Sequence, residues 1–302
     1  MTTVAQQYVR ELNQIAARYG NLEDTTIKRM LSMLKELRQR IAAQLATAQG
    51  WDAVHLERLR DNVEAQIAQF EARLRTELQA AMHHAVLAGL DRVVQPFQEI
   101  GLRSNYHRFS TAQVNAVVDF SARLVQQIAD EARAKIDQQI RLAVLGDKSP
   151  LDAMKGITKD LGLDARTGVW KKRPDPVKGV AARGETILRT EMQRAFNLAT
   201  YSQQQASARD IEGLTKSWMA TSDGRTRPTH LRAHMRYKDN PIPIDEPFQV
   251  GSARLMYPCD PNGPPEETIN CRCRSVTHHP AIGRVGSSLD GRVAAELARR
   301  AG

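Results

Sequence analysis

The sequence S-W-M-A-T-S-D-G-R-T-R-P-T-H-L-R-A-H, at residues 217–234, opens the part of the chain that decides its fold. This part ends with E-E-T-I-N-C-R-C-R-S at residues 266–275. Frequent proline and glycine residues between these motifs predict turns and short strands, whereas most of the remaining sequence has helical periodicity. The same part of the chain holds its most reactive side chains, which are Cys259, Cys271, Cys273, His230 and His234.

Short strands are predicted within and beside this loop-rich region. Residues 214–220 alternate in polarity, as expected of a half-buried strand. Residues 242–244 and 272–276 are two further strand candidates. A helix is predicted over residues 187–199 from the spacing of its apolar side chains. Together these elements predict a small, loop-rich α+β domain.

The histidines and cysteines have a spacing that metal ligands use. His230 and His234 are four residues apart, which places both imidazoles on one face of a helix. Cys271 and Cys273 are two residues apart, which places both thiols on one side of an extended segment. Such a set suits tetrahedral zinc, with Cys259 as a spare ligand. Because C-x-C is less diagnostic than C-x-x-C, the alternative stays open that the cysteines are buried apolar residues and the histidines bond locally.

Nucleophilic catalysis is a further alternative for the same residues. Cys271 or Cys273 could act as a nucleophile with His230 and Asp223. The sequence offers no recognisable oxyanion loop for such a site, which favours a protein that is not an enzyme.

Two arginines, Arg225 and Arg227, follow a predicted Asp-Gly turn. Guanidinium groups form bidentate pairs with carboxylates, so we expect these arginines to pair with residues such as Glu191, Glu266 or Glu267. Such pairs would tie together the loops of a domain that has little apolar area. Phosphate binding is the alternative role for these arginines.

Apolar residues recur at three- and four-residue spacing through the first half of the chain, which predicts a series of amphipathic helices. Tyr19-Gly20-Asn21 is expected to end the first of them, Pro96 to break the pattern after the third, and Ser149 to cap the last. The predicted helices span residues 1–18, 24–48, 52–90, 111–145 and 149–161. Stripes this long must bury against each other or against a partner, and we expect the helices to be partly disordered without that partner.

The predicted fold class is mostly α, with a long N-terminal helical module followed by the small α+β domain. The predicted domains are an extended helical docking module at 1–165, a basic linker at 166–182, the α+β domain at 183–280 and a basic tail at 281–302. We expect the tail to form a short basic helix that is mobile or ordered by a partner. In the linker, Lys171, Lys172 and Arg173 are candidates for nucleic-acid contact through phosphates.

Composition limits the class of protein. The 302 residues are 41% hydrophobic and 25% charged, which is ordinary for a globular chain, and the net charge of +9 suits an anionic partner such as nucleic acid. Three cysteines do not form the disulfide framework of a small secreted protein. No signal peptide and no run of about 18 apolar residues is evident, so we expect no membrane partner.

Five short motifs, in a fixed order, resemble those of the phage Mu protein F-like head morphogenesis family. The resemblance covers residues 183–277, roughly a third of the chain. The motifs are R-T-E-x-x-x-A-x-N (Arg189, Thr190, Glu191, Ala195, Asn197), K-x-W-x-A (Lys216, Trp218, Ala220), D-x-R-T-R-x-x-H (Asp223, Arg225, Thr226, Arg227, His230), P-x-D-P (Pro258, Asp260, Pro261) and E-x-I-N-C-R-C (Glu267, Ile269, Asn270, Cys271, Arg272, Cys273).

The resemblance implies a minor head, or minor capsid, protein of a tailed bacteriophage. Such a protein associates with the portal protein or the major capsid protein, close to packaged double-stranded DNA. It assists head morphogenesis, DNA packaging or DNA delivery (ejection). The expected location is the virion, in the head near the portal vertex, and the host cytoplasm during assembly.

The resemblance also marks the residues that we expect to form the domain. These structural motif residues are Arg189, Glu191, Asn197, Trp218, Asp223, Arg225, Arg227, His230, Asp260, Asn270, Cys271, Arg272 and Cys273. The family usually has glycine at the position of Cys259, and His234 lies in a variable region, so His230, Cys271 and Cys273 remain as the family-like metal candidates. No cofactor is expected, with zinc as the alternative. The competing function is a metal-dependent or DNA-binding protein that acts on packaged DNA through this cluster.

Overall fold

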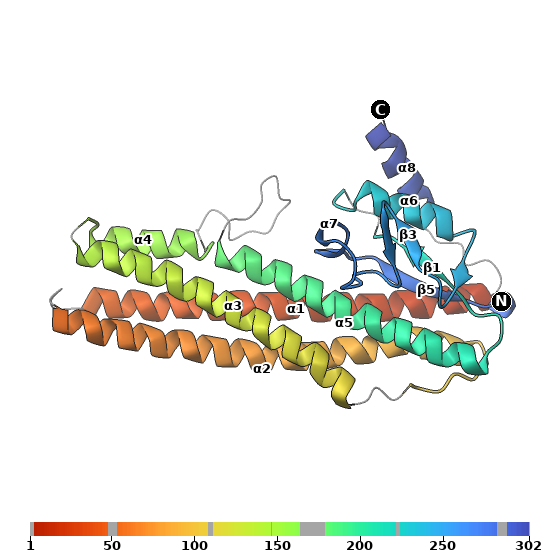
Figure 1. The fold of residues 1–302 in the computed structure, drawn as a ribbon, viewed down its shortest axis with the longest axis horizontal. Coiled ribbons are helices and arrows are strands. Elements are labelled where there is room, and N and C mark those ends of the chain that lie inside the picture. The colour runs from red at the N-terminus through yellow and green to blue at the C-terminus, as the bar shows by residue number, and fades with distance from the viewer. Residues whose placement is uncertain are drawn as a thin grey trace. The chain divides into compact units, whose positions relative to one another are not determined.

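The structure is a computed structural model that describes residues 3–47, 53–107, 111–145, 147–163, 179–221, 224–282 and 289–301. Long helices occupy its first part, and short antiparallel strands with loops follow (Figure 1). This confirms the predicted fold class, a mostly α chain with a small α+β region. None of the described helices combines the length and the apolar character needed to cross a membrane.

Five helices precede the first strand of the described structure, and shorter helices lie between and after the strands. The long helices are α1 (Val4–Thr47), α2 (Ala53–Glu99), α3 (Thr111–Val144), α4 (Pro150–Asp160) and α5 (Val180–Asp210). The remaining elements are β1 (Thr215–Met219), α6 (Pro228–Tyr237), β2 (Ile242–Pro243), β3 (Phe248–Val250), β4 (Ala253–Leu255), α7 (Pro265–Thr268), β5 (Arg274–His278), a 3₁₀ turn η2 (Pro280–Ile282) and α8 (Leu289–Ala301).

The chain forms two compact units, and each is built from separated segments. The first unit, called the head-domain unit below, combines residues 1–23, 81–117 and 189–302. The second, called the helical unit, combines residues 24–80 and 118–188. The domain boundaries predicted at residues 165, 182 and 280 remain predictions.

Two predicted helix breaks are wrong. α1 runs through Tyr19 and Gly20, and α2 runs through Pro96 to Glu99. Tyr19 is buried, and its ring lies 4.4 Å from the ring of Phe196, so its packing outweighs the helix propensity lost at the adjacent glycine. Pro96 lies close to the helix end, where fully buried neighbours such as Phe97 hold the last turn.

The apolar stripes of the helical unit bury against each other. Their central residues are fully buried, among them Met30, Leu34, Ile41, Leu74, Ile128, Ile136 and Ile157. Ion pairs then connect neighbouring helices along the rim, as between Arg29 and Glu77 at 2.6 Å. The expectation that these stripes have little in the chain to bury against is therefore wrong, because the helices supply each other's partners.

Ser149 caps α4 as predicted. Its side chain accepts a hydrogen bond from the amide of Asp152 at 3.2 Å, and Pro150 occupies the first helical position. Serine at the cap and proline directly after it are both favoured at a helix start.

The head-domain unit contains a three-stranded antiparallel sheet in the order β2-β1-β5, and β3 and β4 form a separate hairpin. The pairing places Trp218 opposite Ser275. α6 packs against β1, β3 and α8. A hydrophobic core lies between these elements, with Trp218, Leu231, Phe248, Leu255 and Val293 among its buried members.

Strand β5 is fastened to helices that lie far away in the sequence. The hydroxyl of Tyr8 in α1 donates to the carbonyl of Thr277 at 2.7 Å. The guanidinium of Arg92 in α2 donates to the carbonyl of Ser275 at 2.9 Å. The amide of Gln204 in α5 donates to the side-chain hydroxyls of both Ser275 and Thr277 at 3.0 Å. Parts of α1 and α2 are therefore integral to the head-domain unit.

The C-terminal tail is a helix, as predicted, but the expectation that it is mobile or ordered by a partner is wrong. Val293 of α8 is fully buried in the core of the head-domain unit, and Leu297 packs against that core. Arg300 donates to the carbonyls of Thr226 and Gly224 at 2.6 and 2.8 Å. The chain thus supplies its own docking site for this helix.

Close contact between α2 and α5 yields a testable prediction. A Cβ at Gly89 would lie 2.2 Å from the carbonyl oxygen of Phe196 and 2.8 Å from the Cβ of Ala199. Gly89→Ala should therefore lower the free energy of unfolding by about 1–3 kcal/mol or more, because backbone atoms must move apart. Urea unfolding followed by circular dichroism measures this change.

The matched control is Gly20→Ala, since Gly20 is also inside a helix but has no atom within 4 Å of an added Cβ. Alanine there should raise the free energy of unfolding by about 0.5–1 kcal/mol. Equal effects of the two substitutions would contradict the packing of α2 on α5.

Candidate functional site

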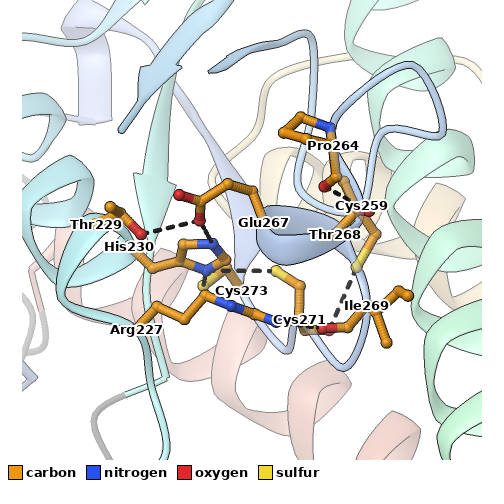
Figure 2. A network of polar contacts seen from close by, with 10 residues as sticks. All are labelled: Arg227, Thr229, His230, Cys259, Pro264, Glu267, Thr268, Ile269, Cys271 and Cys273. Atoms are coloured by element: carbon orange, nitrogen blue, oxygen red, sulfur yellow. Dashed lines mark hydrogen bonds and ion pairs between the residues drawn. The ribbon is translucent and has the colours of Figure 1, made fainter. Parts of the chain in front are cut away.

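Three side chains that the sequence singled out meet in the interior of the head-domain unit. The Nδ1 atom of His230 lies 3.2 Å from the sulfur of Cys273 and 3.6 Å from the sulfur of Cys271 (Figure 2). The three potential ligand atoms all lie within 4.8 Å of one another. Each residue is at most 2% exposed. We call His230, Cys271 and Cys273 the His-Cys cluster.

Local structure explains how the cluster assembles. Pro228 begins α6, so that His230 lies in its first turn. Asn270 has a φ of 56°, in the left-handed region that asparagine tolerates better than most residues. This residue turns the chain after α7 and directs the C-x-C segment toward α6. Its own amide donates to the hydroxyl of Thr190 at 3.0 Å.

Glu267 holds the imidazole from the other side. Its Oε2 atom lies 2.9 Å from the Nε2 atom of His230 and accepts a hydrogen bond from the hydroxyl of Thr229 at 2.9 Å. A carboxylate at Nε2 places the proton on that nitrogen and leaves the lone pair of Nδ1 directed at the thiols. From the sequence, Glu267 was expected to pair with an arginine. Its position four residues before Cys271, in the E-x-I-N-C-R-C motif, was the available signal.

Cys271 is the thiol most suited to carry a negative charge. Burial alone would raise its pKa, but hydrogen bonds with Cys259 and Cys273 and the nearby imidazole of His230 hold the pKa of Cys271 well below its usual range. Burial raises the pKa of Cys273 well above its usual range, and the adjacent Cys271 raises it further.

Cys259 lies beside the cluster rather than in it. Its thiol donates to the carbonyl of Cys271 at 3.3 Å, as Figure 2 shows. Its φ is 65°, a backbone conformation that favours glycine. This geometry explains why glycine suits the position.

His234 is turned away from the His-Cys cluster. Its Nδ1 atom faces the amide of Ala220 at 3.4 Å, and its Nε2 atom lies 3.1 Å from the Oδ1 atom of Asp290 in α8. The structure thus uses His234 to attach the C-terminal helix.

Two motif residues, Asn197 and Arg227, and two of their neighbours in the fold hold the backbone in and just before the C-x-C segment. The side-chain amides of Gln193 and Asn197 in α5 both donate to the carbonyl of Cys273 at 3.1 Å. Arg227 donates to the carbonyl of Ile269 at 2.6 Å. Thr221 donates to the carbonyl of Arg272 at 2.8 Å. In these contacts the four side chains satisfy carbonyl groups of a segment that has no regular secondary structure.

Two charged motif residues of α5, Arg189 and Glu191, form ion pairs. Glu191 pairs with Arg194 at 2.8 Å, and Arg194 also donates to the carbonyl of Cys259 at 3.3 Å. Arg189 pairs with Glu23 of α1 at 2.9 Å.

The other motif residues line turns or the core. The carboxylate of Asp260 accepts hydrogen bonds from the amides of Met256 and Asn262 at 2.9 and 3.0 Å. The ring of Trp218 lies edge-on to that of His230, with 5.3 Å between centroids. Arg225 is exposed. Asp223 and the basic triplet Lys171, Lys172 and Arg173 lie outside the described residues.

Lys216 is a buried motif residue that the sequence analysis left without a role. Its Nζ atom donates to the carbonyl of Met256 at 2.8 Å and lies 4.7 Å from the centre of the Tyr201 ring. Burial lowers the pKa of Lys216 to about 7, although Asp245 and Asp260 act in the opposite direction. Its contacts give it a packing role beneath the β3–β4 hairpin.

A model of the family described as Phage Mu protein F like protein matches residues 168–276. The matched residues include the whole His-Cys cluster, Glu267 and the amides that hold Cys273. The match confirms the resemblance inferred from the five motifs, and it indicates a phage head or head-morphogenesis protein. Searches of curated proteins and of solved structures gave no match.

A buried histidine at the end of β5 predicts a pH dependence. Burial lowers the pKa of His278 from 6.5 to about 4, and its Nε2 atom lies 2.7 Å from the hydroxyl of Ser217. Between pH 4 and 6.5 the unfolded chain therefore binds more protons than the folded chain. The free energy of unfolding should fall as the pH falls through this window, by at most roughly 3 kcal/mol for this residue.

Urea unfolding at a series of pH values tests this prediction. The control is His278→Gln, which keeps a hydrogen-bonding group near Ser217 but does not titrate. The variant should show a shallower dependence on pH, because only His234, whose pKa burial also lowers, then contributes in the same direction from this region. Identical slopes would show that His278 is not held neutral.

Proposed function

We propose that this chain is a minor head protein of a tailed bacteriophage that associates with the portal or capsid and assists head morphogenesis. The match of residues 168–276 to a phage head family is the observation that carries this proposal. The matched range includes the residues that fasten the C-x-C segment, which supports a structural role for this domain. DNA packaging and DNA delivery are the steps in which such a protein would take part.

The burial of the His-Cys cluster favours a structural role over an enzymatic one. A nucleophilic cysteine must reach a substrate, but Cys271 and Cys273 are each 1% exposed. The polar neighbours of the cluster are likewise directed toward protein groups, as Glu267 is toward His230 and Thr229. An activity on packaged DNA through these residues would require the domain to open.

The charge of the chain suits a protein that lies near DNA. The net charge is +9. Several arginines of the helical unit nevertheless pair with carboxylates of neighbouring helices, such as Arg73 with Glu36 and Arg133 with Glu64, both at 2.8 Å. We propose that the chain lies inside the head near the portal vertex and is attached mainly through protein contacts.

Two exposed leucines offer a contact surface for the portal. Leu145, directly after α3, is 73% exposed, and Leu151, in the first turn of α4, is 66% exposed. Single exposed leucines are common, but two of them on either side of one short turn make this corner of the helical unit the most apolar exposed feature of its described surface.

Co-expression with the portal protein encoded by the same genome tests the proposal. After nuclease treatment the chain should elute with the portal ring on gel filtration. The double variant Leu145→Asp, Leu151→Asp should weaken this association by roughly tenfold or more, because charges at an apolar contact cost affinity.

The matched control is Leu87→Asp, at a leucine of the head-domain unit that is 45% exposed. This variant should elute with the ring as the wild type does. A wild-type chain that stays apart from the ring, and is absent from purified particles by mass spectrometry, would overturn the proposed function.

A further inference from the structure

We propose that His230, Cys271 and Cys273 bind a zinc ion that joins the start of α6 to the C-x-C segment. The inference does not depend on the proposed role in the phage head. It rests on the positions of three ligand atoms and on the group that orients the histidine.

The distances between the ligand atoms suit tetrahedral zinc. With Zn–S bonds of about 2.3 Å and Zn–N bonds of about 2.0–2.1 Å, sulfur and nitrogen ligands lie roughly 3.6 Å apart at tetrahedral angles. The Nδ1 atom of His230 lies 3.2 Å from one sulfur and 3.6 Å from the other. An ion can therefore be accommodated with small shifts of side chains that already face one another (Figure 2).

Glu267 provides the outer contact that zinc-binding histidines commonly have. Its carboxylate lies 2.9 Å from Nε2, the ring nitrogen opposite the proposed metal ligand. The hydroxyl of Thr229 holds the same carboxylate oxygen at 2.9 Å. This carboxylate–histidine–metal order fixes the tautomer and the orientation of the imidazole.

Cys259 is excluded from the proposed ligand set. The three ligand atoms of the His-Cys cluster form a group that does not include its sulfur, and its thiol is engaged by the carbonyl of Cys271. The protein then supplies three ligands, and the fourth position is left for a small ligand such as water.

The metal content of the full-length chain, purified under reducing conditions without a histidine tag, tests the proposal. Elemental analysis should find zinc in stoichiometric amount. After removal of the metal by a chelator, addition of Co²⁺ should produce the visible bands of a tetrahedral site and thiolate-to-cobalt absorption in the near ultraviolet. Chelation should also lower the unfolding temperature by several degrees, and zinc should restore it.

Variants separate the ligands from their neighbours. Cys271→Ser and Cys273→Ser should each reduce the thiolate-to-cobalt absorption, and Glu267→Gln should weaken zinc binding by about 10- to 100-fold in competition with a chelator. Cys259→Gly is the matched control, because glycine suits its φ of 65°, and this variant should keep the full absorption.

Two results would overturn the proposal. One is a folded wild-type chain without stoichiometric zinc whose metal-free form gives no thiolate-to-cobalt absorption, a measurement that needs no variant to fold. The other is a loss of absorption in Cys259→Gly as large as in Cys271→Ser, which would replace the three-ligand assignment.

Discussion

The carbonyl group of Cys273, held by two buried amides of α5, is the constraint on which the head-domain unit depends. Gln193 and Asn197 are fully buried, and both donate to this one oxygen. A buried carbonyl without partners would be costly, so the two amides determine where the C-x-C segment can lie. That position in turn presents two thiols to His230 and starts β5 in register with β1.

Buried side chains of the first two helices also donate to backbone carbonyls of β5. Tyr8 and Arg92 reach the carbonyls of Thr277 and Ser275, and both side chains are buried. The head-domain unit consequently includes residues 1–23 and 81–117 together with 189–302. Because α1 and α2 each contribute residues to both units, parts of these helices belong to the head-domain unit.

Local patterns in the sequence predicted much of this structure. Helical periodicity located the long helices, alternation located β1, and the spacing of Cys271 and Cys273 placed their thiols on one side. Contacts between distant segments could not be predicted in this way. The burial of Tyr19 against Phe196 carries α1 past its glycine, and the buried face of α8 fixes the tail. Glu267 was missed as the partner of His230 because the contact joins α7 to α6, 37 residues apart in the chain.

Hydrogen exchange of the folded protein tests the central claim most directly, since it compares the C-x-C segment and β5 with α5. If the buried amides make this segment part of the core, amides of residues 271–278 should exchange as slowly as those of residues 193–204, through the same global unfolding event. Rapid exchange of residues 271–278 while α5 remains protected would contradict the account, because the segment would then open independently of the helix that is said to hold it.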